Sequence, residues 1–322
     1  MKNFRHINAA STDDAVEILK RYGRRAAIIA GGTDLLGKMK DEIMPFYPEA
    51  LVNIKTIPGL DFISSRDGTL TIGALTRLED IATNATIRSA YSGLAEAARR
   101  TASAHLREMG TIGGNICQDV RCWYYRNANN SFPCLRKGGG RCYAIDGDNR
   151  YHSIFGGSVE QGCYAVHPSD TAPALIALDA TILTSKRAVK AENFFRVSVA
   201  KTTILDDDEI VTAIEIPVPA GKSAFTKFSL RKTIDFPIVN CAAMVTISKG
   251  EVTAARICLN AVYIKPYRAI KAEEAIIGKA FTDANAEAAG VVAVADARPM
   301  SFNAYMVPIA KAMVKRTILG CA

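Results

Sequence analysis

The apolar positions of this chain recur at helical and strand spacings in short, alternating segments. Near the N-terminus, a cap at Ser11 or Thr12 precedes an apolar helix face within 15–19, and Gly23 follows. Apolar runs predict strands at 26–30, 51–57 and 69–76. Helices are predicted at 78–87, where Thr76 opens the helix, and at 93–109.

The later part of the chain is richer in strand patterns. Strands are predicted at 174–185, 209–219, 224–230, 239–248 and 254–263, followed by a helical run at 269–280 and a terminal helix. Pro217, Pro219 and Gly221 mark a domain boundary between the first two of these strands and the rest. The predicted class is α+β, with a small α+β domain at the C-terminal end.

The composition is typical of a globular protein with a positive net charge. The chain has 322 residues, 49% hydrophobic residues and a formal net charge of +8. The basic residues are spread along it, so we expect no nucleic-acid partner. No apolar run approaches the roughly 20 residues that span a bilayer, so we expect no membrane insertion. The N-terminal segment lacks the apolar stretch of a secretory signal, which predicts a cytoplasmic protein unless a partner exports it already folded.

Two pairs of glycines follow or precede apolar segments. Gly31 and Gly32 come directly after a predicted strand, and Gly113 and Gly114 lie about eighty residues later. Turns of this kind let backbone N–H groups approach a phosphate. Two of them favour an extended ligand with a pyrophosphate, and the lack of G-x-G-x-x-G disfavours a Rossmann site.

Four of the eight cysteines are spaced along one polar, glycine-rich segment. Cys122, Cys134, Cys142 and Cys163 are separated by twelve, eight and twenty-one positions. Their spacing leaves three interpretations open: an iron–sulfur cluster, a zinc site or thiols without metal. Because such a segment has few apolar residues, we expect something other than a hydrophobic core of its own to order it.

The other cysteines carry less information. Cys241 and Cys258 stand in alternating apolar runs and are predicted to be buried, whereas Cys321 is uninformative. Cys117 follows the second glycine pair and is expected to pack against a cofactor or the core.

Three motifs occur in this order: AGGTDLL at 30–36, TIGGN at 111–115 and HPSDTAPALIALDA at 167–180. Together they resemble the FAD-binding medium subunit of the molybdenum hydroxylases, the family of xanthine dehydrogenase, CO dehydrogenase and aldehyde oxidoreductases. In most of that family the Ser-Asp pair closely follows TIGGN, but here Ser169 comes more than fifty residues after Asn115. A cysteine-bearing insert at this place resembles the 4-hydroxybenzoyl-CoA reductase β subunit and the FAD subunit of ferredoxin-coupled periplasmic aldehyde oxidoreductases.

The resemblance implies a two-part FAD-binding domain of the xanthine dehydrogenase medium-subunit type plus a small C-terminal α+β domain. The implied boundaries are 1–220 for the FAD-binding domain (1–55 and 56–220, with an iron–sulfur insert at 117–165) and 221–322 for the C-terminal domain. The implied FAD-binding residues are Ala30, Gly31, Gly32, Thr33, Asp34, Leu35, Thr111, Gly113, Gly114, Asn115, Asp170, Val211 and Lys227. Residues 231–235 match a mobile loop beside the flavin.

For the insert, the resemblance implies a [4Fe–4S] cluster with Cys122, Cys134, Cys142 and Cys163 as ligands. We expect the backbone N–H groups of 138–140 to donate to cluster sulfides. Arg121, Arg136, Lys137 and Arg141 are expected to surround the cluster and to attract an acidic ferredoxin.

The implied function is an electron-transfer subunit of an oxidoreductase complex, with no catalytic residue and no substrate site of its own. Its partners would be a large subunit with the molybdenum cofactor, a small subunit with [2Fe–2S] clusters and a ferredoxin-like carrier. Two alternatives stay open: an FAD subunit of an NAD-dependent xanthine dehydrogenase, and a zinc-stabilised subunit that binds FAD only for assembly. Substrate and direction of electron flow stay open as well.

Overall fold

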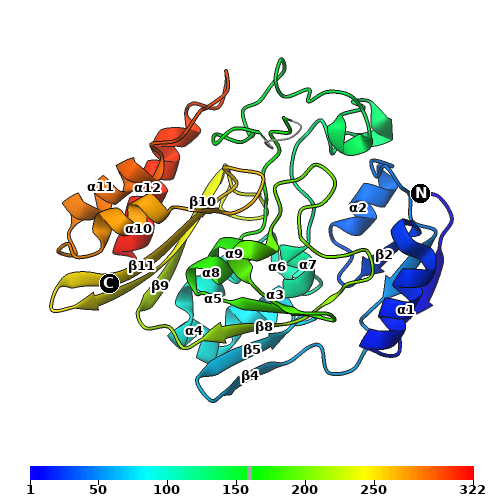
Figure 1. Cartoon of the computed structure of the whole chain (residues 1–322), viewed down its shortest axis with the longest axis horizontal. Helices are drawn as coiled ribbons and strands as arrows, with labels where there is room; N and C mark the ends of the chain where they lie inside the picture. The colour runs from blue at the N-terminus through cyan, green and yellow to red at the C-terminus, as the bar shows by residue number, and fades with distance from the viewer. Residues whose placement is uncertain (158–161) are drawn as a thin grey trace.

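The computed structural model describes residues 1–157 and 162–322 and begins with a three-stranded parallel sheet in the order β1-β3-β2 (Figure 1). Its elements are β1 (Arg5–Asn8), α1 (Thr12–Tyr22), β2 (Ala26–Ile29), α2 (Leu35–Lys40) and β3 (Ala50–Asn53). The predicted cap of α1 is confirmed, because the Ser11 hydroxyl accepts the Asp14 N–H at 3.1 Å. Gly23 ends the helix with φ +54°.

A five-stranded antiparallel sheet follows, and its central strand comes from late in the chain. The order β4-β5-β8-β6-β7 places β8 between two strands that are far from it in sequence. Its strands are β4 (Ile63–Arg66), β5 (Thr69–Gly73), β6 (Thr181–Thr184), β7 (Ala188–Lys190) and β8 (Val211–Pro217). The intervening helices are α3 (Leu78–Thr83), α4 (Ala85–Ala90), α5 (Ser92–Arg99), α6 (Ala104–Arg107), α7 (Ile112–Ile116), α8 (Thr171–Ala177) and α9 (Ala191–Phe194).

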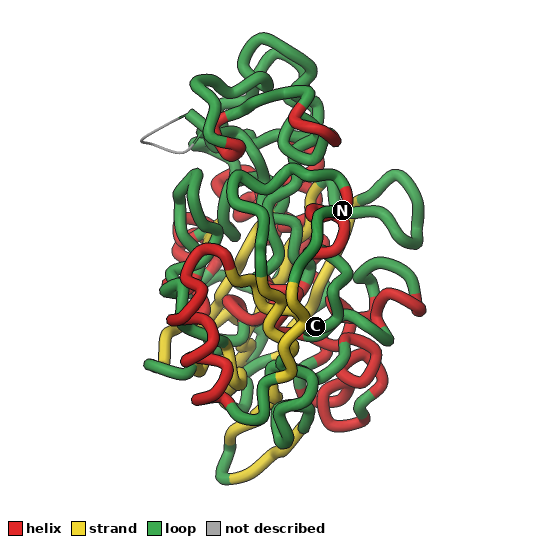
Figure 2. Tube along the Cα trace, turned by 90° about the vertical axis from the view of Figure 1, so that its right-hand side faces the viewer, coloured by secondary structure: helices red, strands yellow, loops and turns green. Residues whose placement is uncertain are grey.

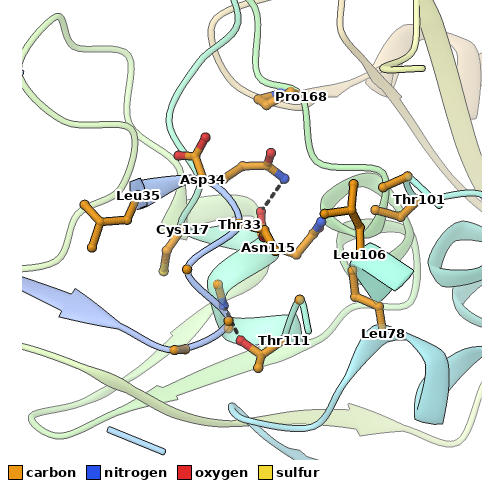
Figure 3. Close-up of a pocket in the computed structure, with 18 of the residues that line it drawn as sticks. Thr33, Asp34, Leu35, Leu78, Thr101, Leu106, Thr111, Asn115, Cys117 and Pro168 are labelled. Carbon is orange, nitrogen blue, oxygen red and sulfur yellow. Dashed lines mark hydrogen bonds between the residues drawn. The ribbon is translucent and has the colours of Figure 1, made fainter. Parts of the chain in front are cut away.

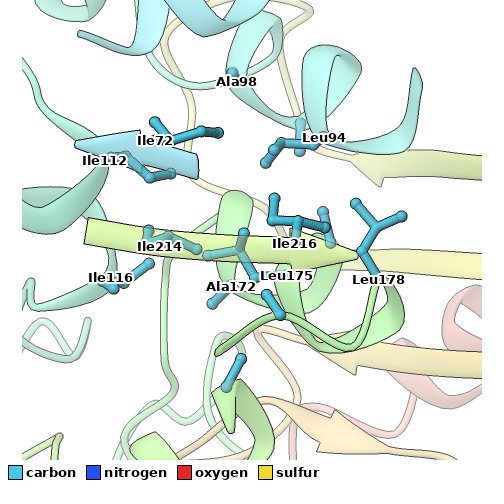
Figure 4. Close-up of a cluster of buried hydrophobic side chains, with 14 of the residues drawn as sticks. Ile72, Leu94, Ala98, Ile112, Ile116, Ala172, Leu175, Leu178, Ile214 and Ile216 are labelled. Carbon is cyan, nitrogen blue, oxygen red and sulfur yellow. The ribbon is translucent and has the colours of Figure 1, made fainter. Parts of the chain in front are cut away.

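The main hydrophobic core lies between this sheet and the helices. Ile72 of β5 and Ile214 of β8 are fully buried with Leu94 of α5 and Leu175 of α8 (Figure 4). Burying side chains of this size stabilises a fold by about 1.5–3 kcal/mol each. The core therefore fixes α7 and α8 against the sheet.

The C-terminal part contains a four-stranded antiparallel sheet. One face of this sheet packs on the main core, and the other face packs on a second core formed with the C-terminal helices. Its order is β12-β11-β10-β9, from β9 (Lys222–Phe228), β10 (Val239–Ser248), β11 (Glu251–Asn260) and β12 (Tyr267–Arg268). Alternate residues of β10 separate cleanly: Ala242 joins the core of α5 and α8, whereas Cys241 and Ala243 join that of the terminal helices. These helices are α10 (Ile270–Ile276), α11 (Asp283–Ala293) and α12 (Met306–Leu319). The predicted burial of Cys241 and Cys258 is confirmed.

The cysteine-bearing insert stands at one end of the molecule, away from the sheets (Figures 1 and 2). It is mostly loop and turn, with short 3-10 helices at Ala128–Asn130 and Leu135–Lys137. Val120, Tyr125, Cys134 and Cys163 of the insert are buried in a small cluster with Ile43 and with Ile264 of the C-terminal domain. The insert therefore buries apolar surface together with neighbouring segments.

The predicted helices and strands needed three corrections. The helix expected at 93–109 is two, α5 and α6, because Ala102 adopts φ +49° and Ser103 caps a new helix. The helix at 78–87 begins after Arg77, and Asn84 divides it by capping α4. The strand expected at 174–185 begins as helix α8, all of whose residues are buried, because a continuous apolar run has no period that separates helix from strand.

The mixed helix and strand content confirms the α+β class. Within residues 1–157 and 162–322, every helix is too short or too polar to cross a membrane.

Candidate cofactor sites

A cavity of about 370 Å³ lies where the N-terminal sheet, α7 and the 234–236 loop meet (Figure 3). The structure brings nearly all predicted FAD residues to its walls, namely Ala30, Gly31, Gly32, Thr33, Asp34, Leu35, Thr111, Gly113, Gly114, Asn115, Asp170 and Val211. Lys227 is not among the lining residues. Segments from both ends of the FAD-binding part of the sequence therefore form one pocket.

The glycines of the pocket allow two chain segments to touch. A Cβ at Gly31 would collide with the carbonyl oxygen of Met109, and one at Gly113 would lie 2.9 Å from the carbonyl oxygen of Ala74. Gly32 adopts φ +71°, which side chains rarely tolerate. These positions require glycine for packing and backbone shape, independently of any ligand.

The second glycine motif is the start of a short helix rather than a free turn. Thr111 caps α7, and its hydroxyl accepts the Gly114 N–H at 3.1 Å. The Asn115 side-chain oxygen accepts hydrogen bonds from the hydroxyls of Ser169 (2.5 Å) and Thr171 (2.7 Å). The motif is thereby held rigidly against the segment that carries Asp170.

Asp34 joins the first glycine motif to the insert. Its carboxylate lies 2.8 Å from Arg126 Nη1 and 3.1 Å from Arg121 Nη2, and it accepts the Asp119 N–H at 3.0 Å. Burial raises the pKa of Asp34, but Arg126, Lys38 and Arg121 together outweigh burial and hold the pKa below its ordinary value. The insert is thus anchored to the pocket wall by a charged side chain.

Asp170 is held from behind by the C-terminal sheet. Lys227 Nζ donates to Asp170 Oδ2 at 2.7 Å, and Asn240 Nδ2 donates to Oδ1 at 2.6 Å. Burial raises the pKa of Asp170, and Lys227 and Asn240 oppose that rise. Lys227 therefore contacts the pocket through Asp170.

The four predicted ligand cysteines line one small cavity in the insert. Cys122, Cys134, Cys142 and Cys163 share it with three tyrosines and the buried Arg136. Burial, with the nearby Cys163 and Cys142, raises the pKa of the Cys122 thiol to about 12. Among the described residues, no group of three or more His, Cys, Asp or Glu side chains is arranged to hold a metal ion.

Two side chains of the insert contact the cysteine sulfurs. His152 Nε2 lies 3.2 Å from Cys122 Sγ, and Arg136 Nε donates to Cys163 Sγ at 3.4 Å. Burial lowers the pKa of His152 to about 4, so the ring is neutral near pH 7. Each cysteine in contact thus faces a nitrogen that is able to donate.

The glycine run at 138–140 was expected to donate to cluster sulfides, and for two of its residues this is wrong. The Gly138 N–H bonds to the Leu135 carbonyl oxygen at 3.1 Å and the Gly139 N–H to that of Cys134 at 2.9 Å. These bonds close the 3-10 turn, so the N–H groups are already used.

The expected ring of basic residues is also only partly present. Arg136 lies against Cys163, whereas Lys137 donates to the Asn127 carbonyl oxygen and Arg141 stacks on Tyr143 at 4.5 Å. Arg121 points to Asp34 and to the ring of Phe236, which lies 4.0 Å from its guanidinium carbon.

Cys117 and His167 lie outside the cysteine cavity. Cys117 borders the glycine-lined pocket of about 370 Å³, and burial raises the pKa of its thiol to about 12. His167 is fully buried and packs on the Phe195 ring at 4.8 Å between centroids. The position of Cys117 fits its expected packing role.

A third cavity, of about 550 Å³, lies between the two sites. Arg121, Asp235 and Phe236 border both it and the glycine-lined pocket of about 370 Å³, and Cys122 borders both it and the cysteine cavity. Arg231 pairs with Asp235 at its rim. The pocket and the cysteine cavity are therefore separated by a short stretch of protein around Arg121–Cys122.

Lys38, Arg126, His152 and Asn240 also belong to these sites but were not predicted. Nothing in the composition of the insert marks its charged residues as buried, although an arginine that is buried needs a carboxylate or carbonyl partner. Asn240 stands inside an apolar strand, where a polar residue requires a buried partner.

Comparison with family models matches nearly the whole chain. Residues 2–219 match the FAD binding domain in molybdopterin dehydrogenase, and residues 223–320 match the CO dehydrogenase flavoprotein C-terminal domain.

Individual relatives agree. The aldehyde oxidoreductase FAD-binding subunit PaoB of Escherichia coli (strain K12) is 34% identical over 298 residues, which are 89% of this chain and 88% of that protein. The carbon monoxide dehydrogenase medium chain of Hydrogenophaga pseudoflava is 28% identical and covers 96% of this chain and 93% of its own length. A solved carbon monoxide dehydrogenase structure from the same organism superposes with a TM-score of 0.78 at 28% identity, covering 99% of this chain and 97% of that one.

Proposed function

This chain belongs to the family of FAD-binding medium subunits of molybdenum hydroxylases, and from that premise we propose that it carries FAD together with a [4Fe–4S] cluster as an electron-transfer subunit. It would connect a molybdenum-dependent oxidoreductase of the aldehyde oxidoreductase or hydroxybenzoyl-CoA reductase type to a ferredoxin-like carrier. FAD binding follows from the family. The cluster, the carrier and the substrate are the parts that we propose.

The pocket of about 370 Å³ is the proposed FAD site. The backbone of 30–35 and 111–115 would hold the pyrophosphate and ribityl chain. Gly31 and Gly32 would let N–H groups of the first segment approach the ligand. The N–H groups of Gly113 and Gly114 already bond to Ala74 and Thr111, so the second segment would contribute close backbone approach rather than these two donors. Asp170 and Val211 would face the cofactor, and Lys227 would hold Asp170 in place from β9. FAD supplies the exchange of two electrons, and the chain contributes binding and orientation.

The convergence of Cys122, Cys134, Cys142 and Cys163 on one cavity is the observation that carries the cluster proposal. They come from four different positions along the insert, and four cysteine thiolates are the ligand set of a [4Fe–4S] cluster. Such a cluster supplies one-electron transfer.

The relatives favour an aldehyde as the substrate of the whole complex. The aldehyde oxidoreductase subunit of Escherichia coli is 34% identical to this chain. We propose that the substrate binds in a large subunit with the molybdenum cofactor, and that a small [2Fe–2S] subunit lies between that site and the flavin. The basic net charge of +8 supports an acidic ferredoxin as the external carrier.

The test is the content of iron, acid-labile sulfide, zinc and released flavin per chain in anaerobically purified protein. We expect about four iron, about four sulfide and about one FAD. Cys142→Ala should lose iron, whereas Cys117→Ala, whose thiol lies outside the cysteine cavity, should keep it. FAD with zinc and no iron would support the zinc-stabilised alternative, and bleaching of the flavin by NADH would support the NAD-dependent one.

A further inference from the structure

Two nitrogen donors of the insert reach the sulfurs of two of the four cysteines. His152, 1% exposed, places Nε2 at 3.2 Å from Cys122 Sγ, and Arg136, 7% exposed, places Nε at 3.4 Å from Cys163 Sγ. We propose that these residues are positioning residues that raise the reduction potential of the cluster and thereby favour electron flow from flavin to cluster. This inference rests on the proposed function, because it requires a cluster in the cysteine cavity.

The protonation state of the sulfur decides which atom donates the hydrogen bond between His152 and Cys122. A thiolate bound to iron has no proton, so it accepts and the ring nitrogen donates. His152 must then carry its proton on Nε2. A neutral imidazole with this tautomer makes an N–H···S bond without adding charge.

The fold holds the His152 ring in this orientation. Its backbone N–H donates to the Asn149 carbonyl oxygen at 3.1 Å, and its own carbonyl oxygen accepts from Asn303 Nδ2 at 2.9 Å. The ring packs beside those of Trp123 and Tyr124, with centroids 6.0 and 5.9 Å away. Because Asn303 comes from the C-terminal domain, that domain helps to position the donor.

Arg136 is held with equal firmness. Its Nη1 and Nη2 donate to the carbonyl oxygens of Val199 (3.1 Å) and Ser198 (2.9 Å), which leaves Nε directed at Cys163. Asp119 lies 3.7 Å from Nη1 and offsets part of the guanidinium charge. His152 is neutral, so replacing it removes a hydrogen-bond donor without changing the charge. It is therefore the better residue of the two to test.

The direction of the effect follows from charge. Reduction adds one electron to the cluster and increases the negative charge on its thiolates. Donors directed at these sulfurs stabilise the reduced form more than the oxidised form, and more strongly in a dry interior than in water. Outer partners of metal ligands are known to tune a site in this way.

The experiment is a potentiometric titration of the full chain, monitored by the EPR signal of the reduced cluster, with dithionite as the electron donor. His152→Phe keeps an aromatic ring and removes the donor. We expect about a tenfold shift of the one-electron equilibrium toward the oxidised cluster, which corresponds to a potential lower by about 59 mV. His152→Gln, which returns an N–H near the sulfur, should recover most of the shift. Tyr151→Phe, next to His152 but without a sulfur contact, should leave the potential unchanged.

The outcomes separate the inference from the function on which it rests. If the wild-type chain contains no iron or sulfide, the proposed function is wrong. If the cluster has the same reduction potential in His152→Phe as in the wild type, only the inference about His152 is wrong. If His152→Phe loses its cluster, retention in His152→Gln at the wild-type potential supports the donor role. Loss of the cluster from both variants assigns His152 a packing role and overturns the proposal.

Discussion

Lys227 and Asp170 form an ion pair with 2.7 Å between Nζ and Oδ2, and both side chains are only 3% exposed. The pair joins β9 of the C-terminal sheet to the Ser-Asp segment at the wall of the large pocket. Because each charge is buried, neither tolerates the loss of the other. The two halves of the chain are therefore coupled at the proposed flavin site.

Removing one member of this pair should destabilise the protein strongly. We expect Lys227→Met to lower the free energy of unfolding by about 3–5 kcal/mol, because Asp170 keeps a buried charge without its cation. Denaturant unfolding monitored by circular dichroism measures the change. In the double variant Lys227→Met with Asp170→Asn, both charges are absent and most of the stability should return. A double variant as unstable as the single one would show that packing of the Lys227 stem, not charge, matters.

The close approach of Gly31 to Met109 predicts a sharp effect of one methyl group. In Gly31→Ala the new Cβ meets the Met109 carbonyl oxygen, so the pocket wall has to move. We expect FAD affinity to fall by at least about tenfold, or about 1.4 kcal/mol. Flavin retained after gel filtration and fluorescence titration measure the loss.

Gly37→Ala is the matched control. Gly37 lies in α2, and a methyl group added there would meet nothing within 4 Å. Alanine at this position should therefore leave FAD binding unchanged and add about 0.5–1 kcal/mol of stability. Equal FAD loss in both variants would contradict the steric argument.

Within the insert, Gly139 should be required for the cysteine cavity. A Cβ there would collide with the Pro133 carbonyl oxygen, next to Cys134, whereas a Cβ at Gly140 meets nothing within 4 Å. We expect Gly139→Ala to lose iron and sulfide and Gly140→Ala to keep both, as measured by colorimetric analysis of each chain. Full iron content in Gly139→Ala would mean that the turn around Cys134 is not needed to hold the cluster.

Glu209 should make stability depend on pH in the acid range. Its side chain is fully buried and accepts hydrogen bonds from Arg187 at 3.0 and 2.7 Å and from the Thr184 hydroxyl at 2.6 Å. Burial raises the pKa of Glu209, but the bonds from Arg187 and Thr184 outweigh it and the pKa is lowered. Its contribution is therefore complete above the unfolded-state pKa of about 4.3 and is lost as pH falls toward the lower folded-state pKa.

The measurement compares wild type with Glu209→Gln by thermal unfolding. At pH 7 the variant should be less stable by about 1.5–3 kcal/mol, the range for hydrogen bonds to a charged group. Below about pH 4 the two proteins should converge, because the wild-type carboxyl becomes protonated. A difference that stays constant down to about pH 3 would count against a role for the Glu209 charge.

Local signals predicted well wherever neighbouring residues decide the outcome. Ser11 and Gly23 bound α1 as expected, because capping involves only residues within one turn. The apolar segment at 239–248 was correctly predicted as a strand, β10. The apolar run at 174–185 misled, because full burial of α8 erased the helical period that would have distinguished it from a strand.

By itself the sequence determined which residues are candidates for binding cofactors: two glycine motifs, a Ser-Asp pair and four cysteines in one insert. Only the tertiary structure decided how they meet, for example that β8 pairs between β5 and β6 and brings Val211 to the pocket. It also decided that Asp34 pairs with Arg126, and that His152 and Arg136 reach the cysteine sulfurs. The physical reason is that turns and caps form from adjacent residues, whereas buried charges and donors find partners through the packing of segments distant in the chain.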